Sequence, residues 1–135
     1  MPFVLGASIA ATWVFADGEH PVAERALAEL RTDEAVVPTL WWFEVRNILI
    51  ASERRKRLTE SDTRKFLRDV SRLSIRADHA PDEGQVLRLA RRHRLSVYGA
   101  SYLELAQRRG LSLATIDIDL AKVARAIGVP IVGEG

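Results

Sequence analysis

The stretch "LSVYGASYLELAQRRGLSLATIDIDLAKVA" at residues 95–124 decides the fold class. Its apolar start at 95–99 predicts a short buried strand, and the residues that follow predict a helix that ends at Gly110. Residues 112–117 predict a second strand that runs into a turn, and 119–127 predict a second helix. Strand and helix therefore alternate twice in one continuous stretch, which is the pattern of a parallel sheet covered by helices.

The same alternation continues outward on both sides of this stretch. Further predicted elements are a strand at 3–6, a helix at 7–16, a break at 18–21, a helix at 22–32, a strand at 34–38, helices at 40–57 and 59–73, an edge strand at 74–78, a helix from Pro81 to Arg92 and a last strand at 129–133. Thr59 and Asp62 resemble a capping box. We expect a three-layer α/β/α protein with a small parallel sheet of four to five strands. Its ligands should bind at the carboxyl edge of the sheet.

The composition indicates one globular domain over residues 1–135. A hydrophobic fraction of 47% and a charged fraction of 28% match a soluble protein with an ordinary core. The chain has no cysteine, which excludes disulfides and thiolate metal sites and fits a reducing cytoplasm. No apolar run approaches the roughly 20 residues of a membrane span. We therefore expect a cytoplasmic protein without a membrane partner.

The charge is distributed unevenly. Residues 46–94 carry 14 Lys and Arg against 7 Asp and Glu, whereas the other 86 residues carry 6 against 11. This asymmetry suggests a basic face for a polyanion beside an acidic site. Solvated helix faces with an incidental bias would give the same count, and charge alone does not separate the two.

Acidic residues at three positions could meet at the carboxyl edge. Glu44 is the only acid between Ala35 and Ala51, and an isolated carboxylate among apolar residues needs a cation, a donor or water. A first-turn acid that faces solvent is the alternative. Asp117 and Asp119 follow a predicted strand, and one of them is expected to cap the next helix. Ser8, Asn47 and Thr115 are candidate supporting polar residues.

Glycine occupies two similar junctions. Both "FVLGAS" at 3–8 and "SVYGAS" at 96–101 place Gly-Ala-Ser after a short apolar run and before a helical pattern. A glycine at such a corner is ordinary where the backbone needs a positive φ or a close approach. It also leaves the corner without a side chain that could contact a ligand.

The chain resembles the PIN-domain family, in particular the VapC-type toxins of bacterial toxin–antitoxin pairs. The resemblance spans essentially the whole length and rests on "FVLGAS", "PTLWWFEVRNIL", the stretch at 95–124 and the terminal "GVPIV". It implies a metal-dependent endoribonuclease that cleaves single-stranded RNA and uses Mg²⁺ or Mn²⁺. It also implies a homodimeric toxin with a cognate antitoxin protein that occupies or crowds the acidic pocket.

The resemblance implies four carboxylates around the metal ions, and two of them are missing. The matching positions are Gly6, Glu44, Gly99 and Asp117, so that glycine stands where relatives carry aspartate. Glu44 and Asp117 remain as catalytic and metal-binding candidates, with Asp119 as a partial substitute. The expected result is an impaired ribonuclease with a weakened metal site. A non-catalytic module that binds an antitoxin or RNA is the alternative.

A basic cluster fits an RNA substrate. Arg54, Arg55, Lys56 and Arg57 follow one another at the predicted end of a long helix. They could contact RNA phosphates and give a salt-dependent affinity that is mostly independent of sequence. A solvated helix end is the other interpretation of this cluster.

Overall fold

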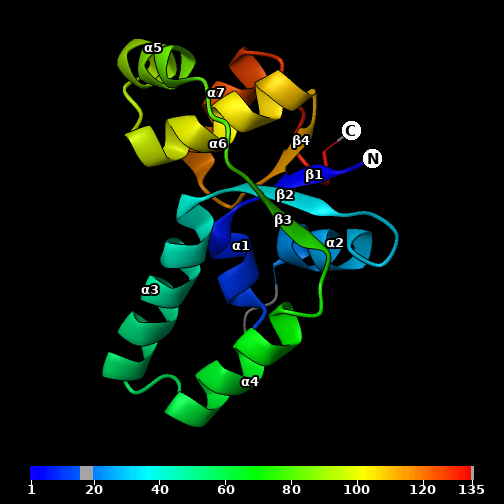
Figure 1. The fold of residues 1–135 in the computed structure, drawn as a ribbon, viewed down its shortest axis with the longest axis vertical. Helices are drawn as coiled ribbons and strands as arrows, with labels where there is room; N and C mark the ends of the chain where they lie inside the picture. The colour runs from blue at the N-terminus through cyan, green and yellow to red at the C-terminus, as the bar shows by residue number, and fades with distance from the viewer. Residues whose placement is uncertain (16–19, 135) are drawn as a thin grey trace.

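The structure is a computed structural model that describes residues 1–15 and 20–134 (Figure 1). Its strands are β1 (Phe3–Leu5), β2 (Ala35–Pro38), β3 (Ile75–Asp78) and β4 (Ser112–Ala114). All pair in parallel, in the order β3–β2–β1–β4. The predicted small parallel sheet of four to five strands is confirmed with four strands, and its edge strand lies close to the predicted 74–78.

Helices cover both faces of this sheet. They are α1 (Ala7–Thr12), α2 (Pro21–Glu29), α3 (Leu40–Arg54), α4 (Glu60–Val70), α5 (Glu83–His93), α6 (Val97–Arg109) and α7 (Ile118–Ala126). Figure 1 shows α1 to α4 on one side of the sheet and α5 to α7 on the other. The described residues therefore form the expected three layers. None of the helices among them is long and apolar enough to cross a membrane.

The strand order reverses between β1 and β4. The chain builds β1, β2 and β3 in one direction across the sheet and then returns, through α5 and α6 on the other face, to place β4 beside β1. Leu5 pairs with Ala114 at the carboxyl ends of these two strands. Open parallel sheets bind ligands in the crevice at such a reversal. The residues just after Leu5 and Ala114 are therefore placed where a functional site is expected.

Fully buried aliphatic residues from the strands and helices fix this arrangement. Leu5, Leu103 and Leu113 have at most 1% of their surface exposed. They come from β1, α6 and β4, so the core holds α6 directly against the pair of strands at the reversal. The indole nitrogen of Trp13 donates to the carbonyl of Ala23 at 2.9 Å and ties the end of α1 to α2.

A charged network joins α6 to the end of β3. Arg108 donates through Nε to Glu104 at 2.6 Å and through both terminal nitrogens to Asp78, at 3.1 and 3.0 Å. The Glu104 carboxylate is 2% exposed and that of Asp78 is 12% exposed. The negative charges of these two carboxylates are thus balanced mainly by the single guanidinium of Arg108. A terminal nitrogen of Arg109 lies 3.6 Å from Oδ2 of Asp78.

The predicted strand at 95–99 is wrong. Ser96 is the N-cap of α6, its hydroxyl accepts the amide N–H of Gly99 at 3.1 Å, and the helix begins at Val97. Val97 and Tyr98 are 50% and 63% exposed, whereas a central strand would bury them. Their β-forming side chains suggested a strand, but the serine cap determines the local structure. Gly99 therefore lies in the first turn of α6 and not at a strand end.

Several other boundaries differ by a few residues. The capping box of Thr59 and Asp62 is confirmed, and α4 ends at Val70. Asp82, rather than Pro81, begins α5 by accepting the amide N–H of Gln85. Residues 129–133 contribute one parallel bridge, between Leu113 and Ile131, and form no full strand. The helix predicted at 7–16 is too long, because α1 ends at Thr12 and Trp13 is its C-cap. Residue 16 and the start of the break predicted at 18–21 lie outside the described residues.

Candidate functional site

A cavity of about 250 Å³ lies at the reversal of strand order. Gly6, Glu44, Gly99 and Asp117 all line it. They come from the end of β1, from α3, from the first turn of α6 and from the residue that precedes α7. The four positions that the family resemblance singled out, although up to 111 residues apart in the chain, thus surround one space.

Glu44 is held by a buried tyrosine. The hydroxyl of Tyr102 donates to Oε1 of Glu44 at 2.6 Å, and Tyr102 is only 5% exposed. Burial and then the Glu44 carboxylate raise the pKa of Tyr102 far above its usual value, against a smaller lowering by a hydrogen bond from the backbone of Ala7. The phenol therefore remains a donor at any physiological pH, and it orients the carboxylate.

Asp117 has a structural role in addition to its position in the cavity. Its Oδ1 accepts the amide N–H of Leu120 at 3.0 Å and so caps α7. Its own N–H donates to the hydroxyl of Thr115 at 3.1 Å. Thr115 is 7% exposed. Its hydroxyl accepts the backbone N–H of the turn that positions Asp117. Capping the helix, a role predicted for either aspartate, falls to Asp117 and not to Asp119.

Gly6 has an ordinary backbone conformation but lies very close to the backbone of β4. Its φ of −68° and ψ of 143° are accessible to any residue. Its N–H donates to the carbonyl of Ala114 at 2.9 Å, which extends the pairing of β1 with β4. A Cβ built on Gly6 would lie 2.9 Å from that same carbonyl oxygen, closer than real Cβ contacts allow. A side chain at this position requires a small shift between the two strands.

Gly99 has no such constraint. Within the described residues a Cβ built there would meet Leu120 Cδ1 at 3.5 Å and Ser96 Oγ at 3.6 Å, which are ordinary contacts. Among the described glycines a positive φ occurs at positions 110, 128 and 133, and neither Gly6 nor Gly99 has one. Turn chemistry therefore does not explain Gly99, and only a close approach accounts for Gly6.

The two glycines are expected to respond in opposite ways to alanine. Gly6→Ala should lower the free energy of unfolding by about 1–3 kcal/mol, the usual cost of overpacking. Gly99→Ala should raise it by up to about 1 kcal/mol, because alanine is the better helix former. Urea unfolding of both variants measures the difference. Equal effects of the two substitutions would contradict the contrast in local packing.

Tyr102 is expected to make the protein sensitive to alkali. Its pKa is raised in the folded state, so its stabilising contribution is complete below the unfolded pKa of about 10 and is lost as the pH rises above that value. In this range the free energy of unfolding should fall by about 1.4 kcal/mol per pH unit more steeply than in Tyr102→Phe. Unfolding in urea at several pH values tests this. Tyr98→Phe, at a tyrosine that is 63% exposed, is the control and should keep the steep decline.

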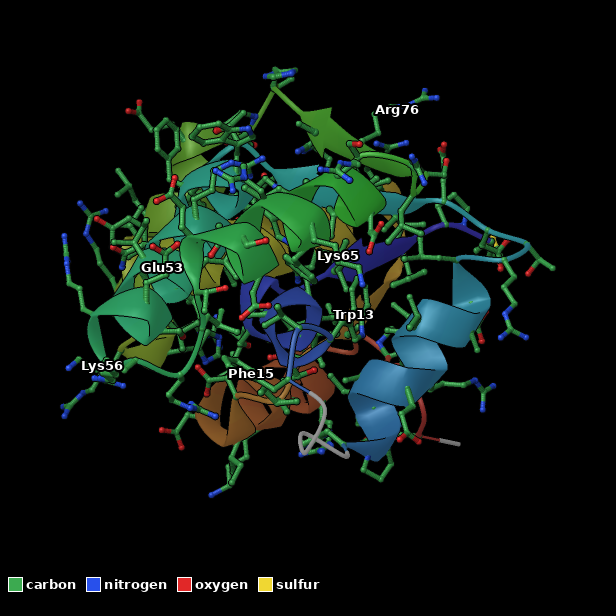
Figure 2. The ribbon with its side chains drawn as sticks, turned by 90° about the horizontal axis from the view of Figure 1, so that it is seen from below. Trp13, Phe15, Glu53, Lys56, Lys65 and Arg76 are labelled. Carbon is green, nitrogen blue, oxygen red and sulfur yellow. The ribbon has the colours of Figure 1, made fainter. Side chains whose placement is uncertain are left out.

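The remaining predicted site residues fall into two groups. Ser8 and Thr115 line the cavity, whereas Asp119 and Asn47 are exposed and do not line it. Arg54 ends α3, and Arg55, Lys56 and Arg57 follow it; all four are exposed. Figure 1 shows that α3 runs away from the sheet, and Figure 2 shows Lys56 at the periphery of the molecule. The basic cluster therefore lies at the end of α3 that is remote from the cavity.

The residues present do not fit the metal centre that the family resemblance implies. Within residues 1–15 and 20–134 no three His, Asp or Glu side chains are grouped to hold a metal ion. Oε1 of Glu44 and Oδ1 of Asp117 already accept hydrogen bonds from the protein. Mg²⁺ prefers about six oxygen ligands in a near-octahedral arrangement. Two engaged carboxylates supply a small part of such a shell.

Tyr102 is a polar cavity residue that the sequence did not predict. It lies three residues after Gly99, which places both on one face of a helix. The mistaken strand at 95–99 concealed this relation, because a helix that begins at Val97 brings Gly99 and Tyr102 to the cavity together. Recognition of Ser96 as a helix cap would have revealed it.

Comparison with known proteins agrees with the geometry. A sequence model of the PIN domain matches residues 3–126, and the chain therefore belongs to the PIN domain family. Members of this family are generally metal-dependent nucleases. The crystal structure of PAE2754 from Pyrobaculum aerophilum superposes with a TM-score of 0.72 over 98% of this chain and 84% of that chain. The two sequences are 23% identical, so this likeness shows a shared fold. No curated protein matched the chain.

Proposed function

We propose that this chain is a VapC-type ribonuclease toxin of a toxin–antitoxin pair whose own hydrolytic activity is strongly reduced or absent. Its parent chemistry is the metal-dependent hydrolysis of RNA phosphodiester bonds. The loss follows from Gly6 and Gly99, which stand where two metal-binding aspartates are expected. The proposal includes action in the cytoplasm, assembly as a homodimer and binding of a cognate antitoxin.

One observation carries the proposal. Gly6, Glu44, Gly99 and Asp117 line a single cavity at the point where the strand order reverses. The close approach of the Ala114 carbonyl gives Gly6 a backbone reason to be glycine, but no such reason applies to Gly99, which lines the same cavity as Glu44 and Asp117. At Gly99 a Cβ makes only ordinary contacts with the part of the chain that the structure describes. Lost carboxylates explain why both glycines border the same acidic space.

The chemistry of the missing groups explains the expected loss of activity. Divalent ions assist phosphodiester hydrolysis by activating water and by neutralising developing negative charge. Carboxylate oxygens are their usual protein ligands. In this chain Tyr102 still orients Glu44, and the cap of α7 still orients Asp117. The framework of the site is therefore kept, while half of its carboxylates are absent.

Exposed apolar side chains beside the cavity support a protein partner. Val97, Tyr98 and Ile118 are 50%, 63% and 72% exposed, and Tyr98 also lines the cavity. They lie in the first turns of α6 and α7, next to Gly99 and Asp117. Exposed apolar residues grouped at a functional cavity are typical of a protein interaction site. An antitoxin that covers this rim would also block the cavity.

A non-catalytic binding module is the second candidate. The observation that favours it is that both remaining carboxylates, those of Glu44 and Asp117, already accept hydrogen bonds within the protein. Such a module would bind the antitoxin or RNA and would hydrolyse nothing, even with its carboxylates restored.

The test compares the metal-dependent cleavage of several single-stranded RNAs by this chain and by the double variant Gly6→Asp, Gly99→Asp. We expect cleavage by the double variant and little or none by the unsubstituted chain. A folded double variant that cuts none of the RNAs would refute the nuclease assignment. Tight antitoxin binding by that inactive variant would instead support the binding module.

A further inference from the structure

A second hollow, remote from the four site positions, lies along α5. It is an open groove of about 890 Å³ bordered by α5, by the C-terminal end of α6 and by the end of α7. Figure 1 shows these three helices together on one side of the sheet. We call it the α5 groove. Its charged and titratable lining consists of Arg88, Arg91, Arg92 and His93.

The α5 groove carries positive charge without compensation. Among residues 1–15 and 20–134 no acid lines the groove, and its other polar lining residues there are Gln85 and Gln107. Across the described ranges, 1–15 and 20–134, the ion pairs do not include Arg88, Arg91 or Arg92. All three arginines are exposed. Nε of Arg88 donates to the side-chain oxygen of Gln85 at 3.0 Å, a neutral partner that leaves the charge of the guanidinium uncompensated. A groove with three guanidinium groups outside any ion pair attracts an anionic ligand.

The helix dipole accounts for only part of this pattern. Cations are favoured in the last turn of a helix, where Arg91, Arg92 and His93 lie. That effect fades beyond one turn, and Arg88 lies farther back. Arg88 shares a helix face with Arg91 and Arg92, at spacings of three and four residues, so the cations form a row along the groove.

Two segments of the chain connect the α5 groove with the cavity. His93 lines the groove and Ser96 lines the cavity, so three positions of chain separate them. On α7 the chain passes from Asp117 and Leu120 at the cavity to Ile127 at the groove. An extended polymer could therefore contact both places.

We propose that the α5 groove binds the phosphodiester backbone of single-stranded RNA and guides the strand to the cavity. Arginine forks suit phosphate oxygens, because their parallel N–H groups can donate in pairs. Arg88 lies about one helical turn, roughly 5.4 Å, before Arg91 and Arg92, and guanidinium groups at two levels fit a polymer with repeated charges better than a single small anion. The inference rests on the proposed function for the identity of the polymer, and it places RNA binding away from the cluster at Arg54.

Binding of an unstructured, fluorescently labelled RNA in EDTA tests this inference without hydrolysis. The test variant is the triple substitution Arg88→Gln, Arg91→Gln, Arg92→Gln. The control is Arg54→Gln, Arg55→Gln, Lys56→Gln, which removes equal charge at the remote end of α3. Exposed substitutions of this kind usually change stability little, and circular dichroism checks that both variants are folded.

The groove variant should bind RNA at least about 10-fold more weakly at low salt, and the control should lose less than about 3-fold. The slope of log affinity against log salt should fall by about 2 in the groove variant, because each phosphate contact to a single strand contributes about 0.7. Unchanged affinity of the groove variant would overturn the inference. An equal loss of RNA affinity in the control would overturn it too, since the loss would then reflect the net charge of the protein and not the position of the arginines.

Two further outcomes separate this inference from its alternatives. If polyglutamate binds through the three arginines and RNA does not, the groove is a site for an acidic protein and the inference is wrong. If the groove variant loses RNA binding while the Gly6→Asp, Gly99→Asp protein cuts no RNA, the groove stands and the proposed hydrolytic function fails.

Discussion

The double variant Gly6→Asp, Gly99→Asp is expected to cleave single-stranded RNA at least about 100-fold faster than the unsubstituted chain when Mg²⁺ or Mn²⁺ is present. Even indirect partners of metal ligands are worth about 10–100-fold in affinity or activity, so the recovery of two direct ligands should exceed that. Both positions line the same cavity as Glu44 and Asp117. Initial rates on labelled RNA, with and without EDTA, give the measurement.

The two substitutions should contribute unequally to stability. At Gly99 an aspartate follows the Ser96 cap at the third helical position, which completes a capping box. At Gly6 the new Cβ must move away from the carbonyl of Ala114. The double variant is therefore expected to fold but to be less stable than Gly99→Asp alone. The same double variant carrying Glu44→Gln is the control, and RNA cleavage that survives Glu44→Gln would place the activity elsewhere.

Replacement of Arg108 is expected to cause the largest loss of stability. Arg108→Met should lower the free energy of unfolding by about 3–5 kcal/mol, the usual cost of leaving a buried charge unpaired. Without the guanidinium, the carboxylate of Glu104, which is 2% exposed, has lost its partner. The carboxylate of Asp78 loses two hydrogen bonds at the same time. Urea unfolding at neutral pH measures the loss.

Controls for this prediction come from the same network. Arg109→Met removes a neighbouring guanidinium, which lies 3.6 Å from Asp78 and is 37% exposed, and should cost less than about 1 kcal/mol. Adding Glu104→Leu to Arg108→Met should restore much of the stability, because it removes the stranded charge. A small loss in Arg108→Met, or no recovery in the double variant, would contradict this description of the network.

The hydrogen bonds of Arg108 also make the stability of the protein depend on pH in acid. The hydrogen bonds from Arg108 are the main cause that holds the pKa of Asp78 below its usual value. Because the pKa of Asp78 is lower in the folded than in the unfolded state, its contribution to stability is complete at a pH above the unfolded-state pKa of about 3.9. This contribution is lost as the pH falls through the folded-state pKa. This loss in acid should therefore be smaller in Arg108→Met than in the unsubstituted protein.

The sequence predicts the fold well where local signals agree. The capping box at Thr59 and the glycine end of α6 at Gly110 mark helix boundaries through chemistry that short sequences display. It fails at residues 95–99, where β-forming side chains outweighed a serine cap in the prediction. Val97 and Tyr98 are exposed in the fold, so their apolar character reflects the cavity rim and not a buried strand.

The candidate site shows a different limit. The residues around Gly6 and Gly99 resemble the family's sequence at two metal-ligand positions, and the structure places both glycines at one cavity. The hydrogen bond from Tyr102 to Glu44 joins residues 58 positions apart, and no local pattern announces it. The Arg108 contact with Asp78 spans 30 positions. Contacts of this kind depend on how α6 packs on the sheet, which only the folded chain reveals.

The most direct test of the central claim is Mn²⁺ binding in crystals, located by anomalous diffraction. For the unsubstituted chain we predict no well-occupied ion in the cavity. For Gly6→Asp, Gly99→Asp we predict an anomalous peak bonded to Glu44, Asp117 and the introduced carboxylates. A strong peak between Glu44 and Asp117 in the unsubstituted chain, or an empty cavity in the folded double variant, would contradict the claim that two metal ligands have been lost.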